Sequence, residues 1–401
     1  MDRPLKFRLS AMMFLEYLVP GATVPILSLY LKNHLHFEPY QAGIVMAMPA
    51  VAAMVAPLVA SHLADRYLSA ERMLSLCHFA CALLMFWLAT LQSFTAFLAV
   101  YFLYGVFFIP TFGLTNAVAL HHMQDARRDF GGIRAWGTVG WVVVAWAFGY
   151  FWLRGGVPGA RLPHALPLSG LASLALAVYS LSFRPAHETA SLQGQTGYGE
   201  VLRLFLRPGM LLLCLLTFLN SACHQFYYFG MSPYLHQVRF PDQYIMPGMS
   251  LGQMSEVVVL GLLGWCLTRI SIKAAMVIGA LAQALRLAMF AFAPNYAVIL
   301  GGISLHGLCY AFFFTAAYLY VERHSTRNTR AGAQQVLTIM ISGGGTLAGF
   351  LSAGWAAQLL TDPQTGLIDY RTFWLIPAGL ATLIAAWIAL GFQEEPQDSP
   401  G

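Results

Sequence analysis

Long apolar runs follow one another along the whole chain, and charged or Pro/Gly-rich stretches separate them. A helix needs roughly 20 apolar residues to cross a bilayer. The pattern therefore predicts an all-α, polytopic membrane protein. The predicted twelve transmembrane helices lie near residues 8–31, 40–64, 71–92, 95–119, 132–153, 165–183, 209–236, 245–268, 273–293, 296–321, 331–360 and 372–392.

Composition supports a membrane protein and argues against several other classes. The 401 residues are 58% hydrophobic and only 10% charged, whereas about a quarter of a soluble protein is charged. The net charge is +5, but the basic residues form no patch with interleaved aromatics, so no nucleic-acid partner is predicted. The six cysteines lie in apolar runs without CxxC or Cys/His spacing. We therefore expect no disulfide framework, metal site or cofactor.

Basic residues predict the orientation of the spans. If the N-terminus is cytoplasmic, the opposite segments carry few basic residues: Lys32, Arg154, Arg161, Arg239 and Arg371. The cytoplasmic segments then carry many more: Arg3, Lys6, Arg8, Arg66, Arg72, Arg127, Arg128, Arg184, Arg203, Arg207, Arg269, Lys273, Arg323, Arg327 and Arg330. The positive-inside rule therefore places both termini in the cytoplasm.

A central polar segment divides the predicted spans into two sets of six. It predicts an N-terminal half at 1–183, a cytoplasmic linker at 184–208, and a C-terminal half with a short polar tail at 209–401. Two parallel six-helix halves are typical of secondary transporters. The Asp65-Arg66 pair between the second and third spans is similar to the acidic-basic loop of the major facilitator superfamily, and it also fits an ordinary charged turn.

Arg134 is an unusual residue for the fifth span, because a guanidinium stays charged and is costly to bury in a membrane. Thr138 and Trp141 follow at i+4 and i+7, so one helix face presents a cation, a hydroxyl and an aromatic ring. Gly137 and Gly140 would allow another helix to approach closely. The alternative is that the long Arg134 side chain reaches the cytoplasmic interface.

Two carboxyl groups lie inside predicted spans. Glu256 is near the middle of the eighth span, and Gln253 lies one turn before it. Glu16 lies about two turns inside the first span, followed by Pro20-Gly21. Removal from water favours the protonated form of a carboxyl, so both are candidate proton carriers. The alternative for Glu256 is a structural pair with a neighbouring helix.

Histidine and tyrosine recur one turn apart in two further spans. His224, Tyr227 and Tyr228 lie in the seventh span, and His306 and Tyr310 lie in the tenth. They would either line a wet cavity or form hydrogen-bonded packing contacts. His224 is a third candidate for proton coupling.

The chemistry of these residues indicates the class of cargo. They supply hydrogen-bonding groups and aromatic faces without a Lys/Arg cluster for a polyanion, so a small, roughly neutral solute with a flat ring or sugar face is predicted. Arg286 in the ninth span and His78 in the third are interpreted as packing residues, because those spans are peripheral in this architecture.

Four segments resemble the nucleoside:proton symporter family of the major facilitator superfamily: "IRAWGTVGW", "GQMSEVVV", "YVERHSTRNTRAGAQQ" and "YRTFWLIPAGLA". The resemblance implies proton-coupled nucleoside import by alternating access in a bacterial cytoplasmic membrane, with nucleosides, protons and lipid as partners and one chain as a sufficient unit. It also implies that matching positions bind the nucleoside, namely Arg134, Thr138, Trp141, Gln253, Glu256 and Tyr310.

The chain departs from the family pattern at several of these positions. His224 and Tyr227 replace an amide pair, His306 replaces an aromatic residue, and Ala311 replaces an acid. Glu16 occupies a position that is usually an amide. Our hypothesis is that the proton-carrying carboxylate has moved from the tenth span of the family pattern to the first span of this chain. Glu16→Gln should then abolish uphill uptake while sparing exchange.

Other functions stay open at this point. Within transport, the cargo could be a sugar or a nucleobase-like metabolite, and the direction could be export. An intramembrane enzyme would need converging catalytic groups, but the adjacent pair His121-His122 fits a solvated loop better, so no catalytic residue is predicted. A receptor or scaffold would bind without flux.

Overall fold

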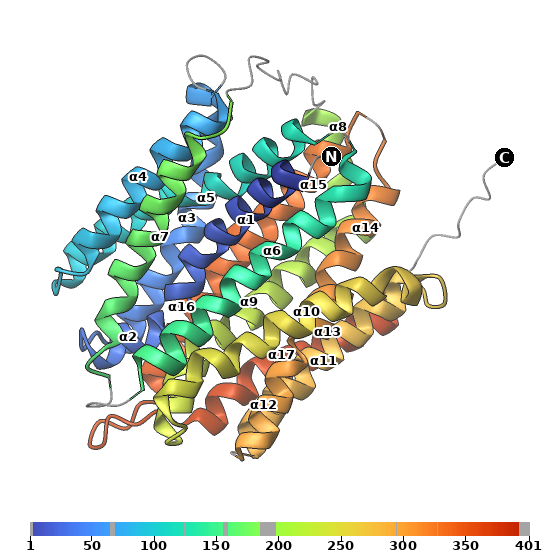
Figure 1. Ribbon diagram of the computed structural model, residues 1–401. Coiled ribbons are helices and arrows are strands. Elements are labelled where there is room, and N and C mark those ends of the chain that lie inside the picture. Colours follow the sequence, from blue (N-terminus) through green and yellow to red (C-terminus); the bar gives the residue numbers. More distant parts are fainter. Residues whose placement is uncertain are drawn as a thin grey trace. The chain divides into compact units, whose positions relative to one another are not determined.

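The computed structural model describes residues 3–64, 69–123, 125–154, 159–184, 198–293, 295–326 and 328–392, and most of them are helical. Thr361 and Ile368 form an isolated antiparallel bridge. Figure 1 labels the α-helices, which follow in the order α1 (Arg3–Thr23), α2 (Leu27–Asn33), α3 (Pro39–Ala64), α4 (Ala70–Leu88), α5 (Phe94–His122), α6 (Ala126–Trp146), α7 (Ala165–Ser180), α8 (Tyr198–Phe205), α9 (Pro208–Gln237), α10 (Ile245–Leu267), α11 (Ile272–Phe292), α12 (Tyr296–Ser304), α13 (His306–Cys309), α14 (Ala316–Arg323), α15 (Arg330–Thr338), α16 (Thr346–Leu359) and α17 (Tyr370–Gly391).

The predicted spans are confirmed as helices. Ten helical segments of the described chain are long and apolar enough to cross a membrane. The second and fifth predicted spans correspond to α3 and to α6, which opens with the polar turn "ARRD". Exposed apolar side chains lie on many of the described helices, for example Leu359 of α16 at 80% and Leu390 of α17 at 86% exposure. Large exposed apolar surfaces mark membrane or protein contacts.

Short π-helices interrupt three of the spans. They are η1 (Ala147–Trp152), η4 (Tyr310–Thr315) and η5 (Ile339–Gly345). The last coincides with the glycine-rich stretch of the eleventh predicted span. π-Turns within helices are frequent at functional sites, and η4 begins at a predicted site residue.

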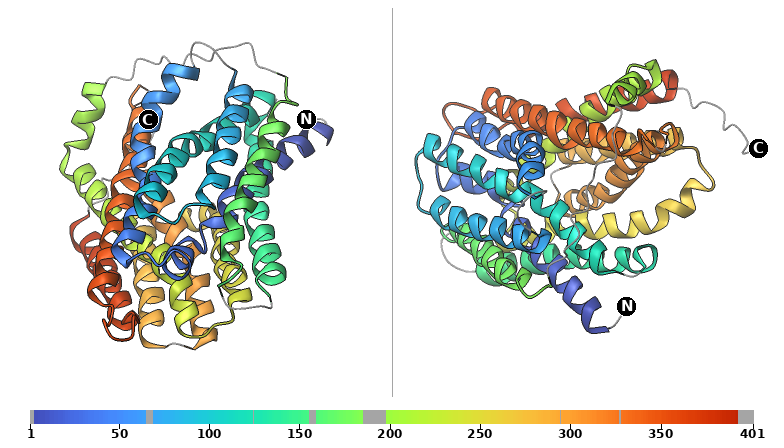
Figure 2. Two further views of the ribbon diagram at one scale, coloured as in Figure 1. Left: turned by 90° about the vertical axis from the view of Figure 1, so that its left-hand side faces the viewer. Right: turned by 90° about the horizontal axis from the view of Figure 1, so that it is seen from above.

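The described helices belong to two compact units. The first unit comprises residues 1–192, 226–251 and 350–368. In it α1 packs along α6 and α7, and α4 packs against α5 and α7, so these blue-to-green helices lie side by side in Figures 1 and 2. One buried cluster of this unit includes Leu9, Met12, Met13, Leu74, Val118 and Leu176.

The second unit comprises residues 193–225, 252–349 and 369–401. Here α11 packs along α17 and against α13 and η4. A buried cluster that joins these helices includes Leu213, Leu216, Met276, Ala280, Phe313 and Ile384. The division of the chain at the 184–208 linker stays a prediction. Helix α8 lies within that linker. The Asp65-Arg66 pair lies outside the described residues.

Glycines allow α1 and α6 to approach closely, as the sequence predicts. A Cβ atom at Gly137 would lie 2.6 Å from the ring of Tyr17, and one at Gly140 would collide with the backbone oxygen of Phe14. A Cβ atom at Gly21 would lie 3.0 Å from the Cα of Trp141. Side chains at these positions would therefore separate the two helices.

Candidate functional site

The first group of candidate residues lies on α6, within the first unit. Arg134, Thr138 and Trp141 are all half-buried, and their spacing places them on one face of the helix. This face combines a fixed positive charge, a hydroxyl and an indole ring.

Arg134 contacts Tyr17 of α1. Its guanidinium carbon lies 4.2 Å from the centre of the Tyr17 ring, and one of its nitrogens donates a hydrogen bond to the Tyr17 hydroxyl. A cation over an aromatic face is attracted by the negative face of the ring. Tyr17 is therefore a further candidate residue, which the sequence did not identify although it follows Glu16 directly in the first span.

Glu16 lies in a polar network of the first unit, between α1, α4 and α5. Its carboxylate accepts hydrogen bonds from the hydroxyls of Thr111 at 2.7 Å and Thr115 at 2.9 Å, and His78 Nε2 lies 2.9 Å away. The side chains of Glu16 and His78 are fully buried. The sequence assigned His78 to packing alone, whereas the structure pairs it with Glu16.

This network can accommodate Glu16 in either protonation state. The Thr111 hydroxyl also lies 2.6 Å from the backbone oxygen of Phe108, and the Thr115 hydroxyl lies 2.7 Å from the backbone oxygen of Thr111. A hydroxyl has one hydrogen to donate and can also accept. Thr111 can thus donate to a carboxylate, or donate to the backbone and accept from a carboxylic acid.

The second group of candidate residues lies in the second unit, where α9, α10, α13 and η4 each contribute. The rings of His224 and His306 are 4.9 Å apart, and each lies 6.1 Å from the ring of Tyr310. Both imidazoles are buried, whereas Tyr310 is 37% exposed. Gln253 and Glu256 are half-buried on α10.

Two glycines bring α10 close to α13. A Cβ atom at Gly252 would lie 3.2 Å from the Cβ of His306, and one at Gly307 would lie 2.5 Å from the carbonyl carbon of Ser255. The Gly307 N–H also donates to the Ser255 hydroxyl at 3.0 Å. As a result Glu256 Oε2 lies 3.6 Å from His306 Nε2.

Arg286 of α11 joins the second group, although the sequence assigned it to packing. Its side chain is fully buried. Nη1 donates to His306 Nδ1 at 2.8 Å and to Cys309 Sγ at 3.4 Å. Sequence alone does not show which face of the ninth span meets the tenth, so this contact could not be predicted.

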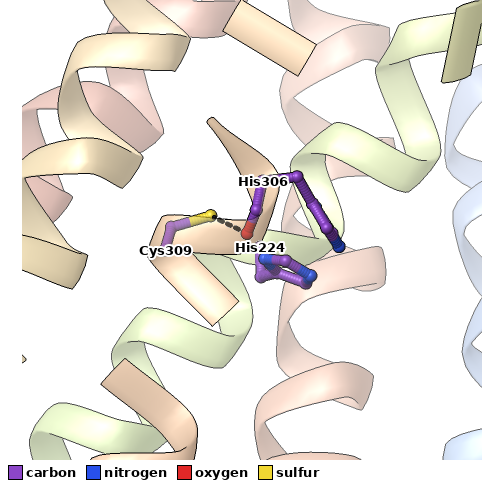
Figure 3. A group of neighbouring side chains, drawn as sticks. All are labelled: His224, His306 and Cys309. Carbon is purple, nitrogen blue, oxygen red and sulfur yellow. Dashed lines mark hydrogen bonds between the residues drawn. The ribbon is translucent and has the colours of Figure 1, made fainter. Parts of the chain in front are cut away.

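His224, His306 and Cys309 form a cluster of potential metal ligands, drawn in Figure 3, with ligand atoms within 4.8 Å of one another. The Cys309 thiol donates to the backbone oxygen of His306 at 3.1 Å. Two of the three potential ligand atoms contact the guanidinium of Arg286. Because this positive charge would repel a metal ion, the cluster is better suited to binding the arginine.

Tyr227 is the remaining candidate. It lies on the part of α9 that belongs to the first unit and is 1% exposed, with its ring 5.2 Å from that of Tyr228. Of the predicted substrate-binding residues, the structure therefore brings His224, Glu256, His306 and Tyr310 together, while Arg134, Thr138 and Trp141 share a separate helix face.

Comparison with known proteins gives matches over nearly the whole chain. The family model described as nucleoside H+ symporter matches residues 3–397. The chain is 28% identical to the putative nucleoside transporter YegT of Escherichia coli (strain K12), over 98% of this chain and 94% of that protein. It is 29% identical to the xanthosine permease of the same organism, over 97% and 96% of the two chains.

Solved structures give the same result for the fold. The crystal structure of the nucleoside transporter NupG superposes with a TM-score of 0.87 at 26% identity, and covers 98% of this chain and 100% of that one. The described helices therefore have the major facilitator fold that the sequence predicts.

Proposed function

This chain belongs to the nucleoside H+ symporter family, and from that premise we propose which of its side chains bind the nucleoside and which carries the proton. The chain is a multi-pass transporter of the inner membrane and not an enzyme, and it moves nucleosides with protons by alternating access. The single observation that supports the assignment of residues is the grouping of Glu256, His306, Tyr310 and His224 in one unit.

The α6 group binds the nucleoside through stacking and hydrogen bonds. Trp141 offers a flat apolar face to the base. Thr138 and the guanidinium of Arg134 donate hydrogen bonds to polar atoms of the cargo. Tyr17 holds the Arg134 guanidinium through its ring and its hydroxyl, so the cation is oriented before the cargo binds.

The second group binds the nucleoside and the proton. Gln253 and Glu256 can accept hydrogen bonds from paired ribose hydroxyls or from the edge of the base, and the half-exposed ring of Tyr310 can stack. His224 and His306 of this group, and Tyr227 on the part of α9 that belongs to the first unit, replace family residues of different shape, so these three determine which nucleoside is preferred.

Glu256 is the proton carrier in this proposal. Its side chain is 24% exposed, whereas Glu16 is completely buried and His224 is 5% exposed. A coupling group has to exchange protons with water during each transport cycle, and partial exposure provides that exchange. Protonation and nucleoside binding then bias the same conformational equilibrium.

Residues 1–183 and 209–401 form the two moving halves, joined by the 184–208 linker, with both termini in the cytoplasm. One chain carries both groups of binding residues, so a monomer is a sufficient transport unit.

Uptake of labelled uridine into proteoliposomes tests this function. With one proton per nucleoside, an inward gradient of one pH unit supports about tenfold accumulation. Glu256→Gln should retain exchange and lose accumulation, whereas Glu200→Gln, a change at an exposed carboxylate on α8, should behave as wild type. Failure of uridine, adenosine and xanthosine to be accumulated would refute the nucleoside assignment, and accumulation of a labelled sugar would then identify the alternative cargo.

A further inference from the structure

Arg286 is a fully buried cation, and the proposed transport cycle assigns no role to it. A guanidinium cannot lose its charge in a protein, and a charge inside a membrane span is costly and commonly functional. The acid that the family pattern leads us to expect at position 311 is an alanine, which is fully buried. The charges next to His306 therefore come from two neighbouring helices, Arg286 on α11 and Glu256 on α10.

The contact between Arg286 and His306 fixes the tautomer of the imidazole. Arginine can only donate hydrogen bonds, and Arg286 Nη1 lies 2.8 Å from His306 Nδ1. Nδ1 is therefore the acceptor and carries no hydrogen. A neutral imidazole then carries its hydrogen on Nε2, which is the atom that lies 3.6 Å from Glu256 Oε2.

We infer that Arg286 is a positioning residue for proton coupling: through His306 it holds an N–H group toward Glu256, so that the transported proton binds the carboxylate and not the imidazole. This inference rests on the proposed role of Glu256. A proton added to His306 would occupy Nδ1, break the hydrogen bond from Arg286 and place two cations side by side. A proton added to Glu256 leaves both contacts of the imidazole in place.

The other titratable groups around His306 do not change this assignment. His224 packs against it from α9 with ring centres 4.9 Å apart, and Tyr310 stacks on it with centres 6.1 Å apart. The Cys309 thiol is directed to the backbone oxygen of His306. These contacts involve neither the hydrogen bond from Arg286 to Nδ1 nor the pair of Nε2 with Glu256, so the charged side chains that contact the imidazole in the described part of the chain are Arg286 and Glu256.

The pH dependence of uptake tests the inference. Arg286→Met removes the charge, whereas Arg286→Lys keeps a charge and a donor. Without the charge, Glu256 and His306 would bind the coupled proton at lower proton concentration. We expect the external pH at half-maximal uridine uptake to rise by about one unit, a tenfold change in proton concentration, in Arg286→Met. Arg286→Lys should stay close to wild type. An Arg286→Met protein that exchanges uridine and keeps the wild-type pH profile would overturn the inference.

A second pair of variants answers the same question if Arg286→Met does not fold. His306→Gln can still direct an N–H group toward Glu256 but cannot become a cation, whereas His306→Leu offers no donor. We expect the pH profile of His306→Gln to resemble that of wild type and the profile of His306→Leu to shift upward. Identical profiles would overturn the inference. Equal accumulation by wild type and Glu256→Gln would instead refute the proposed function.

Discussion

Replacing Glu16 with glutamine changes a buried carboxylate into an amide of the same shape, and we expect this variant to lose stability but to keep pH-driven accumulation. The carboxylate is completely buried and accepts hydrogen bonds from Thr111 and Thr115, with His78 as its third partner. Glu16 therefore joins α1 to α4 and α5, whereas the partly exposed Glu256 is the proton carrier that we propose.

The loss of stability in Glu16→Gln depends on whether each donor to Glu16 has another hydrogen-bond acceptor. A hydrogen bond to a charged group contributes about 1.5–3 kcal/mol and a neutral one about 0.5–1.5 kcal/mol. Both threonine hydroxyls have backbone acceptors, at 2.6 Å and 2.7 Å, so they remain bonded when the charge is removed. The contact with His78 has no such alternative within the network. We therefore expect Glu16→Gln to cost about 1–2 kcal/mol, and Glu16→Ala to cost more because it also leaves a cavity.

Two measurements on one preparation test this reasoning. In detergent, a loss of about 1–2 kcal/mol should lower the unfolding temperature of this 401-residue chain by about 1–2 °C. In proteoliposomes, Glu16→Gln should still accumulate uridine with the pH gradient, and Glu256→Gln is the comparison that should not. A Glu16→Gln protein that melts like wild type and exchanges uridine, but no longer accumulates it, would refute the reasoning and assign the proton to Glu16.

Three further predictions concern the packing of α6 on α1, the helix cap of α17, and the contact of Tyr17 with Arg134. Gly140→Ala should lose about 1–3 kcal/mol by forcing α6 away from α1, while Gly132→Ala on the same helix, with open space around it, should be neutral or slightly stabilising by thermal unfolding. Asp369→Ala should cost about 1 kcal/mol, since Asp369 caps α17. The Thr372 hydroxyl and two backbone N–H groups lower the pKa of the Asp369 carboxyl. Wild type should therefore be more stable than Asp369→Ala above about pH 4 and lose this extra stability at lower pH. A difference in stability that persists at pH 2 would contradict the cap. Tyr17→Phe should raise the uridine concentration at half-maximal uptake by about tenfold, since a hydrogen bond to a charged group contributes about 1.5 kcal/mol or more, and an unchanged concentration would remove Tyr17 from the site.

The shared helix face of some candidate residues was predictable because helical spacing is a local property. Arg134, Thr138 and Trp141 share a face through their separations of four and three residues, and Gly137 and Gly140 show where a neighbour approaches. The histidine–tyrosine pair on the tenth span was identified in the same way, and the structure stacks His306 on Tyr310.

The order of apolar residues was sufficient to place the long helices, because bilayer thickness requires a minimum length of apolar chain, and each segment meets this requirement independently of the others. The sequence also identified the polar residues that are costly in a membrane. Their partners became visible only in the folded chain: Tyr17 contacts Arg134, His78 contacts Glu16, and Arg286 contacts His306. Those contacts join helices far apart in the chain, and the rotation of each helix against its neighbours depends on packing and not on local spacing.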